Sequence, residues 1–170
     1  MLDLSIVLPI YNEEIRLQKS LPIIKKFLEK NKKNKIEIIF VSDGSNDNTN
    51  LIVEKFKSKK NKKLKINFIK YKRNIGKGFA VKKGILNAKN SWILICDIDL
   101  SVHPKQFKVW YNKNFLKSKK EAYYGSREHN KSKVKASKYR VFLGYFFKKI
   151  IRVLFQIELS DTQCGFKVFN

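Results

Sequence analysis

The chain begins with a strand followed by a helix, and residues 5–14, SIVLPIYNEE, carry the decisive part of this unit. Ser5-Ile6-Val7-Leu8-Pro9 is a short apolar run, which is typical of a strand buried in a sheet. Asn12 is a residue type that favours the start of a helix, and we expect it to cap a helix whose apolar positions run from Ile15 to Leu28. A buried strand paired with a following helix is the unit from which the fold is built.

The same alternation continues through the first hundred residues. Its regular pitch predicts right-handed crossovers and an α/β fold, with a mostly parallel sheet flanked by helices on both faces. Ligands of such sheets bind beyond the carboxyl ends of the strands. Further strands are expected at 36–41, 64–69, 92–96 and 121–126, with helices from Asp47 or Asn48 to Phe56 and from Gly76-Lys77-Gly78 to Ala88.

The composition indicates one strongly basic domain rather than a nucleic-acid-binding arm. A length of 170 residues suits a single ordinary domain, and the formal net charge is +24. Residues 1–85 carry +13 and residues 86–170 carry +11, and 33 of the 38 basic side chains are lysines. Specific nucleic-acid readout favours clustered arginine, so we expect no specific nucleic-acid partner. Acidic membrane surfaces would still attract the chain.

The cysteines and the apolar runs indicate the compartment. Cys96 and Cys164 lie far apart and fit neither a disulfide framework nor a paired zinc knuckle. No run of 18 apolar residues and no signal-peptide pattern is present in the sequence. We therefore expect a protein of a reducing, cytoplasmic compartment.

Three of the six aspartates directly follow expected strands: Asp43, Asp97 and Asp99. Asp97 and Asp99 stand two apart, so in an extended chain both side chains point to one side. Two carboxylates converging at a strand end suit a divalent cation such as Mg²⁺ or Mn²⁺, which could bridge a diphosphate. The alternative is that this common Asp-x-Asp pattern only caps a turn or helix before His103-Pro104.

Six stretches together carry a resemblance to a known family. They are Ile6–Glu14, Val41–Ser45, Asn74–Gly78, Asp97–Ser101, Gly125-Ser126-Arg127 and Asp161–Lys167. In this order they resemble the family-2 inverting glycosyltransferases, which have the Rossmann-like GT-A fold. Within that family they are similar to the polyprenyl-phosphate glycosyltransferases, and more to the dolichyl-phosphate β-glucosyltransferase type than to the mannosyl type.

The resemblance implies a nucleotide-sugar pocket in residues 1–100. Pro9, Tyr11 and Glu13 would line it, and Asp43 would accept a hydrogen bond from the base. Helix-start chemistry is the alternative explanation of Tyr11 and Glu13. The resemblance also implies that Lys77, between Gly76 and Gly78, faces phosphate, although Gly-x-Gly before a helix is often only a turn. Asp97 and Asp99 would hold the metal, with Asp99 the more direct ligand and a catalytic residue.

The same resemblance places the acceptor side in residues 101–170. Arg127 would meet the acceptor phosphate with its fork of donors, unless it is a plain surface arginine. Asp161 would be a catalytic residue, either as a general base or by organising its loop. Relatives of this type continue past the Asp161–Lys167 motif, so we expect a single GT-A domain that is incomplete at its C-terminus.

The segment from Tyr139 to Leu159 is rich in aromatic and aliphatic residues, interrupted by Lys148, Lys149 and Arg152. One interpretation is an amphipathic helix lying in a membrane interface, which would give peripheral contact with the cytoplasmic face of a membrane. The other is a helix packed on the sheet, with its lysines reaching out to solvent.

The expected reaction is transfer of a hexose, glucose from UDP-glucose, to a polyprenyl (dolichyl-like) phosphate with inversion, as in protein glycosylation. The enzymatic alternatives are mannose transfer from GDP-mannose and sugar transfer to a surface polysaccharide. An alternative of another class is a non-catalytic, lysine-rich domain that adheres to nucleic acid or acidic membranes.

Overall fold

The computed structural model describes residues 2–58, 64–113, 116, 122–126, 149–150, 154, 161 and 164–170. The chain divides into two compact units, Met1–Tyr123 with Phe166–Asn170, and Tyr124–Gly165. The elements, in chain order, are β1 (Asp3–Ile10), α1 (Glu14–Lys30), β2 (Lys35–Asp43), α2 (Thr49–Lys57), β3 (Lys65–Tyr71), α3 (Lys77–Leu86), β4 (Trp92–Ile95), α4 (Lys105–Asn112), β5 (Ala122–Tyr124) and β6 (Lys167–Phe169).

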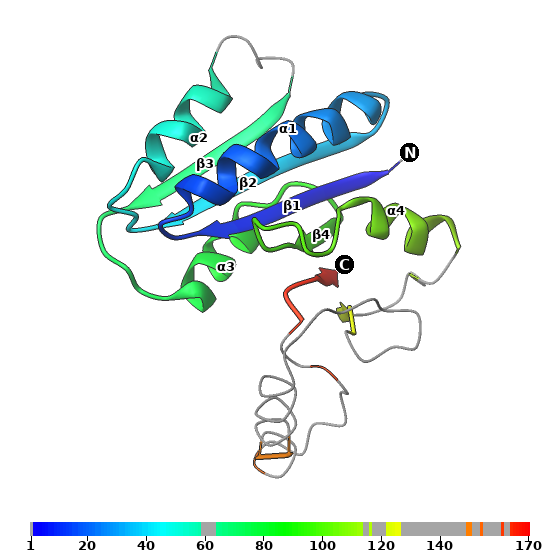
Figure 1. Ribbon diagram of the computed structural model, residues 1–170. Helices are drawn as coiled ribbons and strands as arrows, with labels where there is room; N and C mark the ends of the chain where they lie inside the picture. The colour runs from blue at the N-terminus through cyan, green and yellow to red at the C-terminus, as the bar shows by residue number, and fades with distance from the viewer. Residues whose placement is uncertain are drawn as a thin grey trace. The chain divides into compact units, whose positions relative to one another are not determined.

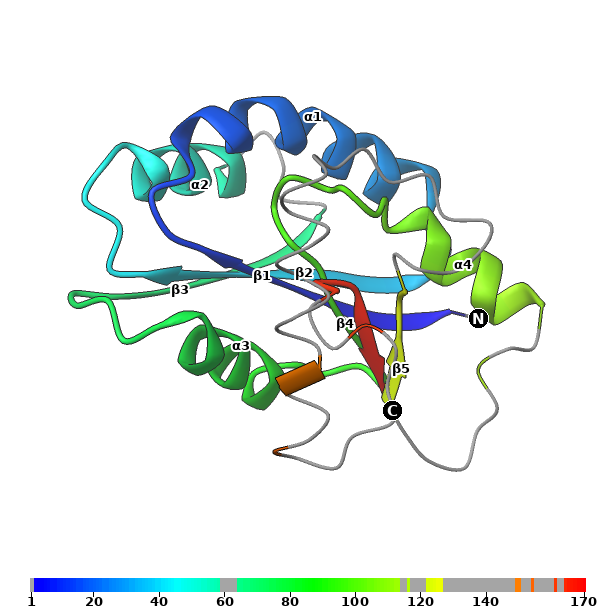
Figure 2. The same ribbon diagram turned by 60° about the horizontal axis from the view of Figure 1, so that its bottom comes forward.

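The strands form one six-stranded sheet in the order β3-β2-β1-β4-β6-β5. β1 pairs in parallel with β2 and with β4, and β2 pairs in parallel with β3. β6 joins the other edge of β4 in the antiparallel direction, with Ile93 opposite Phe169. Figures 1 and 2 show α1 and α2 on one face of the sheet and α3 on the other. The predicted α/β architecture with a mostly parallel sheet is therefore confirmed.

The side chains of the central strands point alternately to the two faces of the sheet and form a hydrophobic core on each face. Val7, Ile39 and Val41 are fully buried and pack with Ala80 of α3. Since neighbouring residues of a strand point to opposite faces, Leu4, Ile6 and Leu8 face the α1 and α2 side. The buried stripe of α1 covers that side with Leu17, Ser20, Leu21, Ile24, Phe27 and Leu28. Close packing on both faces holds the carboxyl ends of β1, β2 and β4 at one edge.

The cap of α1 differs from the sequence expectation. Asn12 does not cap α1: it adopts φ +52°, and its side-chain oxygen accepts a hydrogen bond from the Asn46 backbone N–H. The start of α1 is held instead by Asp47, whose carboxylate accepts from the Glu14 N–H at 3.2 Å. The same carboxylate accepts from the Thr49 N–H at 3.0 Å, so Asp47 serves both α1 and α2. The expected cap was wrong because its replacement comes from the loop after the next strand.

Further expectations for single segments have different outcomes. α4 is a helix that the sequence analysis did not anticipate, and its Phe107 is fully buried. The expected strand at 121–126 is present as the shorter β5. Of the segment 139–159 the structure describes only Lys149, Ile150 and Leu154, so both interpretations of it stay predictions. No helix within the described residues is long and apolar enough to cross a bilayer.

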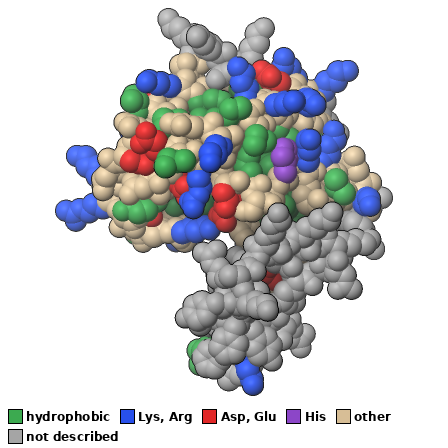
Figure 3. Space-filling model, in the orientation of Figure 1, with side chains coloured by type: hydrophobic (Ala, Val, Ile, Leu, Met, Phe, Trp, Pro, Cys, Tyr) green, Lys and Arg blue, Asp and Glu red, His purple; other side chains and the backbone are tan. Residues whose placement is uncertain are grey.

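The basic side chains do not gather in one patch on the visible face of the larger unit. Figure 3 shows Lys and Arg side chains scattered around its rim, with a few placed among acidic groups near the centre. This agrees with the even spread of charge along the sequence.

Candidate functional site

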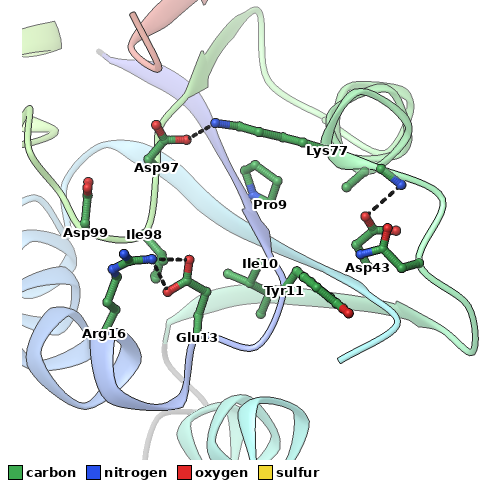
Figure 4. Close-up of a pocket in the computed structure, with 13 residues that line it drawn as sticks. Pro9, Ile10, Tyr11, Glu13, Arg16, Asp43, Lys77, Asp97, Ile98 and Asp99 are labelled. Carbon is green, nitrogen blue, oxygen red and sulfur yellow. Dashed lines mark hydrogen bonds and ion pairs between the residues drawn. The ribbon is translucent and has the colours of Figure 1, made fainter. Parts of the chain in front are cut away.

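A pocket of about 390 Å³ lies at the carboxyl ends of β1, β2 and β4 and beside the N-termini of α1 and α3. This is the edge at which parallel α/β sheets bind ligands. Figure 4 shows side chains from β1, β2, α1, α3 and the loop after β4 converging on it. The lining residues are Pro9, Ile10, Tyr11, Glu13, Arg16, Asp43, Asn74, Gly76, Lys77, Ala80, Asp97, Ile98 and Asp99.

Seven of the nine site residues expected from sequence therefore line one pocket. Two lie elsewhere. Asp161 belongs to the second unit, and Arg127 lies outside the described residues. The individual roles assigned to all nine stay predictions.

Asp43, the last residue of β2, holds the loop that leads into α3. Its Oδ1 accepts from the Ile75 N–H at 2.8 Å and its Oδ2 from the Gly76 N–H at 2.9 Å. Gly44, with φ +71°, allows this close approach, because a Cβ there would lie 2.5 Å from the Arg73 carbonyl carbon. Burial and the neighbouring Asp43 carboxylate raise the pKa of Tyr71 above its ordinary value. A carboxylate can accept more than two hydrogen bonds, so Asp43, which lines the pocket, keeps acceptor capacity for a ligand.

Lys77, the first residue of α3, reaches across the pocket to the loop after β4. Its Nζ lies 2.6 Å from Oδ1 of Asp97 (Figure 4). The side chain of Lys77 is 61% exposed and that of Asp97 is 37% exposed, so both remain accessible to a ligand. The positively charged ammonium group of Lys77 thus lies beside one of the two expected metal ligands.

Asp99 lies in a turn, and the extended chain assumed for Asp97 and Asp99 is not present. The Leu100 N–H donates to the Asp97 carbonyl at 3.0 Å, and Leu100 adopts φ +50°. Both carboxylates nevertheless line the same pocket. Burial by itself raises the pKa of Asp99, but hydrogen bonds from Ser101 and the charges of Arg16 and Lys77 outweigh it, so the pKa lies below its ordinary value. Asp99 is therefore ionised at neutral pH.

Ser20 of α1 holds this turn by a hydrogen bond to its backbone. The Ser20 side chain is buried, and its hydroxyl donates to the Ile98 carbonyl at 2.5 Å. The backbone between the two aspartates is thereby tied to the helix that also carries Arg16. The sequence held no sign of this contact, because a buried serine on a helix stripe has many possible partners.

Arg16 is a pocket residue that the sequence analysis missed. Its Nη1 donates to both carboxylate oxygens of Glu13, at 2.7 and 2.8 Å, and the charge and hydrogen bond of Glu13 raise the pKa of Arg16. Figure 4 shows this pair next to Ile98 and Asp99. The three-residue spacing on the first turn of α1 was the available signal, since it puts both side chains on one helix face.

The pocket lining has an excess of two negative charges, although the whole chain is strongly basic. Glu13, Asp43, Asp97 and Asp99 are opposed only by Arg16 and Lys77. Within the described parts of the chain, no three His, Cys, Asp or Glu side chains form a metal-binding group. The residues fit a cation held by one or two carboxylates whose other ligands are phosphate oxygens and water, which is how proteins usually hold Mg²⁺ on a nucleotide.

The comparisons with known proteins agree with this geometry. The family described as glycosyl transferase family 2 matches residues 5–170. Over 98% of its length the chain is 37% identical to a dolichyl-phosphate beta-glucosyltransferase of Dictyostelium discoideum and 35% identical to one of Saccharomyces cerevisiae, covering 54% of each. The chain thus spans about half the length of these relatives.

The solved structures show the fold. A mannosyltransferase from Pyrobaculum calidifontis, determined with GDP-Man and Mn²⁺, matches with a TM-score of 0.67 at 17% identity, over 99% of this chain and 45% of that protein. The GT-A fold class expected from the sequence motifs is confirmed.

Proposed function

Since this chain belongs to glycosyl transferase family 2, we propose that its pocket binds a nucleotide sugar and that the protein moves a hexose from it to a polyprenyl phosphate. The proposed donor is UDP-glucose and the proposed acceptor is a dolichyl-like phosphate. The relatives at 35–37% identity are dolichyl-phosphate beta-glucosyltransferases, which supports glucose as the sugar.

The observation that carries the proposal is the charge pattern of the pocket. A bare diphosphate would be repelled by the excess of two negative charges, whereas a diphosphate that arrives with a divalent cation would be accepted. Asp97 and Asp99 are the residues that would hold the cation. When bound, it would neutralise the charge that develops on the leaving nucleotide.

The remaining pocket groups are proposed to bind and orient the donor. Asp43 keeps acceptor capacity for a base N–H, and Tyr11, which is 43% exposed, offers a ring face and a hydroxyl at the pocket rim. Lys77 and Arg16 supply positive donors for phosphate oxygens. Pro9 and Ile10 form the apolar floor.

The proposed step joins an oxygen of the lipid phosphate to the anomeric carbon while the bond from that carbon to the UDP oxygen breaks. Attack comes from the face opposite UDP, so the configuration inverts. A phosphate monoester has a second pKa near 6 and is mostly ionised at neutral pH, so no strong base is needed. Positioning then contributes most of the rate, and Arg127 and Asp161 are proposed to provide it on the acceptor side.

We place this reaction at the cytoplasmic face of a membrane, because a polyprenyl acceptor is anchored there and a net charge of +24 attracts anionic lipid. Peripheral contact through the segment 139–159 belongs to this proposal.

The test compares UDP-glucose with GDP-mannose in a thermal-shift experiment, each with and without Mn²⁺. Ligand at a hundredfold excess over Kd stabilises the native state by about 2.7 kcal/mol, so weak binding is detectable. We expect a Mn²⁺-dependent shift with UDP-glucose alone, followed by transfer of labelled glucose to dolichyl phosphate. A shift with GDP-mannose alone would indicate that the donor sugar is mannose and not glucose.

Asp99→Asn separates this proposal from a non-catalytic basic domain. The variant should lose the Mn²⁺-dependent shift, whereas Glu54→Gln, which removes an exposed carboxylate paired with Lys70, should keep it. If Asp99→Asn bound nucleotides and anionic vesicles as strongly as before, without metal, the binding-domain alternative would be the correct one.

A further inference from the structure

Lys77 stands where an α-helix disfavours a positive charge. The N-terminus of a helix carries a partial positive charge, and the first turn of α3 contains no acidic residue to offset the lysine. The N–H groups of Ile75 and Gly76, just before the helix, are already bound by Asp43. Helix stability therefore gives no reason for a lysine at this position, and such a broken local rule points to a role in the site.

The role is indicated by the partner of Lys77. Its Nζ lies 2.6 Å from Oδ1 of Asp97, and the side chain extends from α3 toward the loop after β4 (Figure 4). The ammonium group thus occupies the surroundings of a carboxylate that is also a proposed metal ligand.

We infer that Lys77 and a divalent cation are competing partners of Asp97, and that the cation, arriving with the nucleotide, releases Lys77 to bind phosphate. This inference rests on the proposed function. In the nucleotide-free protein the ammonium partly satisfies the pocket's negative charge, so a cation binding alone meets repulsion from it.

The exchange follows from the chemistry of the two groups. A lysine ammonium is a point charge on a flexible stem, so it can leave Oδ1 of Asp97 without moving α3. A bound cation would neutralise the charge with which Asp97 attracts the ammonium, and a diphosphate would supply new acceptor oxygens for its three donors. Lys77 therefore weakens binding of the cation alone and strengthens binding of the cation together with the nucleotide.

The test measures Mn²⁺ binding by the loss of its free paramagnetic resonance signal, for the 170-residue chain and three variants. We expect Lys77→Ala to bind Mn²⁺ alone about tenfold more tightly, because the competing charge is gone. The same variant should bind UDP-glucose about tenfold more weakly in the presence of Mn²⁺, because a charged phosphate partner is lost. Lys77→Arg keeps the charge and should bind Mn²⁺ alone like the unaltered chain.

Lys70→Ala is the matched control. Lys70 is also an exposed lysine in an ion pair, with Glu54 at 2.5 Å, but it does not line the pocket. The Lys70→Ala variant controls for the loss of one positive charge, and its affinity for Mn²⁺ should equal that of the unaltered chain.

The possible failures are distinct. If UDP-glucose recruits Mn²⁺ but Lys77→Ala binds Mn²⁺ alone no better than Lys70→Ala, the exchange is wrong and the proposed function stands. If neither the unaltered chain nor any variant binds Mn²⁺ even with UDP-glucose present, the exchange and the proposed function are both wrong.

Discussion

The carboxylate of Asp47 accepts a hydrogen bond from the backbone N–H of Glu14, 33 residues before it. The contact is reciprocated, because the Glu14 carboxylate accepts from the backbone N–H of Asn48 at 3.3 Å. The starts of α1 and α2 thus cap each other across the loop that borders the pocket. Neither cap can form until β1 and β2 are paired in the register that brings the two loops together.

Asp47→Ala should destabilise the chain by about 1 to 2 kcal/mol, because one carboxylate serves two helix N-termini. Asp47→Asn has a single acceptor oxygen, so its stability should lie between those of the unaltered chain and Asp47→Ala. The measurement is urea denaturation at pH 7. Full stability of the alanine variant would show that water replaces the caps without cost.

The same residue predicts a pH dependence. Burial alone raises the pKa of Asp47, but hydrogen bonds from Thr49 and Glu14 lower it below its ordinary value of 3.8. A depressed pKa in the folded state stabilises the fold above the unfolded pKa, and this stabilisation is lost as the pH falls through the folded pKa. The stability gap between the unaltered chain and Asp47→Ala should therefore be constant near neutral pH and shrink below about pH 4. A gap that widened in acid would contradict this.

Gly84→Ala should destabilise the fold by about 1 to 3 kcal/mol despite the better helix propensity of alanine. A Cβ at Gly84 would lie 2.2 Å from a methyl group of the buried Val7, where α3 packs on β1. Gly78→Ala in the same helix is the matched control. A Cβ there meets no atom of the described chain within 4 Å, and the change should stabilise by up to about 1 kcal/mol. Chemical denaturation of both variants checks the opposite signs.

Ser20→Ala should weaken the proposed binding of UDP-glucose, although Ser20 does not line the pocket. It removes the hydrogen bond that holds the Ile98 carbonyl between Asp97 and Asp99, at a cost of about 1 kcal/mol in stability. Because the turn loosens, we expect nucleotide affinity to fall while the pocket side chains stay the same. Calorimetric titration with UDP-glucose and Mn²⁺ measures this affinity, and Ser20→Thr, which retains the hydroxyl, should preserve most of it.

Under the proposed function, Arg16→Ala should lower UDP affinity several-fold, by an amount limited by solvent screening, since the side chain is 61% exposed. Lys19→Ala, one turn further along α1 and outside the pocket, controls for the loss of charge. Equal affinities for the two variants would remove Arg16 from the binding site.

Strands β1 to β5 and the positions of Asp43, Asp97 and Asp99 were predictable because their signals are local, whereas Pro9, Tyr11, Glu13 and Lys77 were expected from the resemblance to the glycosyltransferase family. Apolar runs mark the strands, and the polar residues that end β1, β2 and β4 must meet at one edge once the sheet is parallel. The contacts of Asp43 with the loop before α3, of Ser20 with Ile98 and of Asp47 with Glu14 were not predictable, since each joins segments far apart in the sequence. Arg16 was missed for a different reason: on an exposed first turn, an arginine three residues after a glutamate is usually only a surface pair.

The antiparallel strand β6 has a consequence for synthesis on the ribosome. β4 has one edge on β1, and among the described residues its other edge is paired by residues 167–169. Residues 96–166 must be translated in between, which at a few to twenty residues per second lasts several seconds or more. During that time the nascent chain presents an unpaired apolar strand edge, the kind of surface that chaperones recognise and that other nascent chains can join.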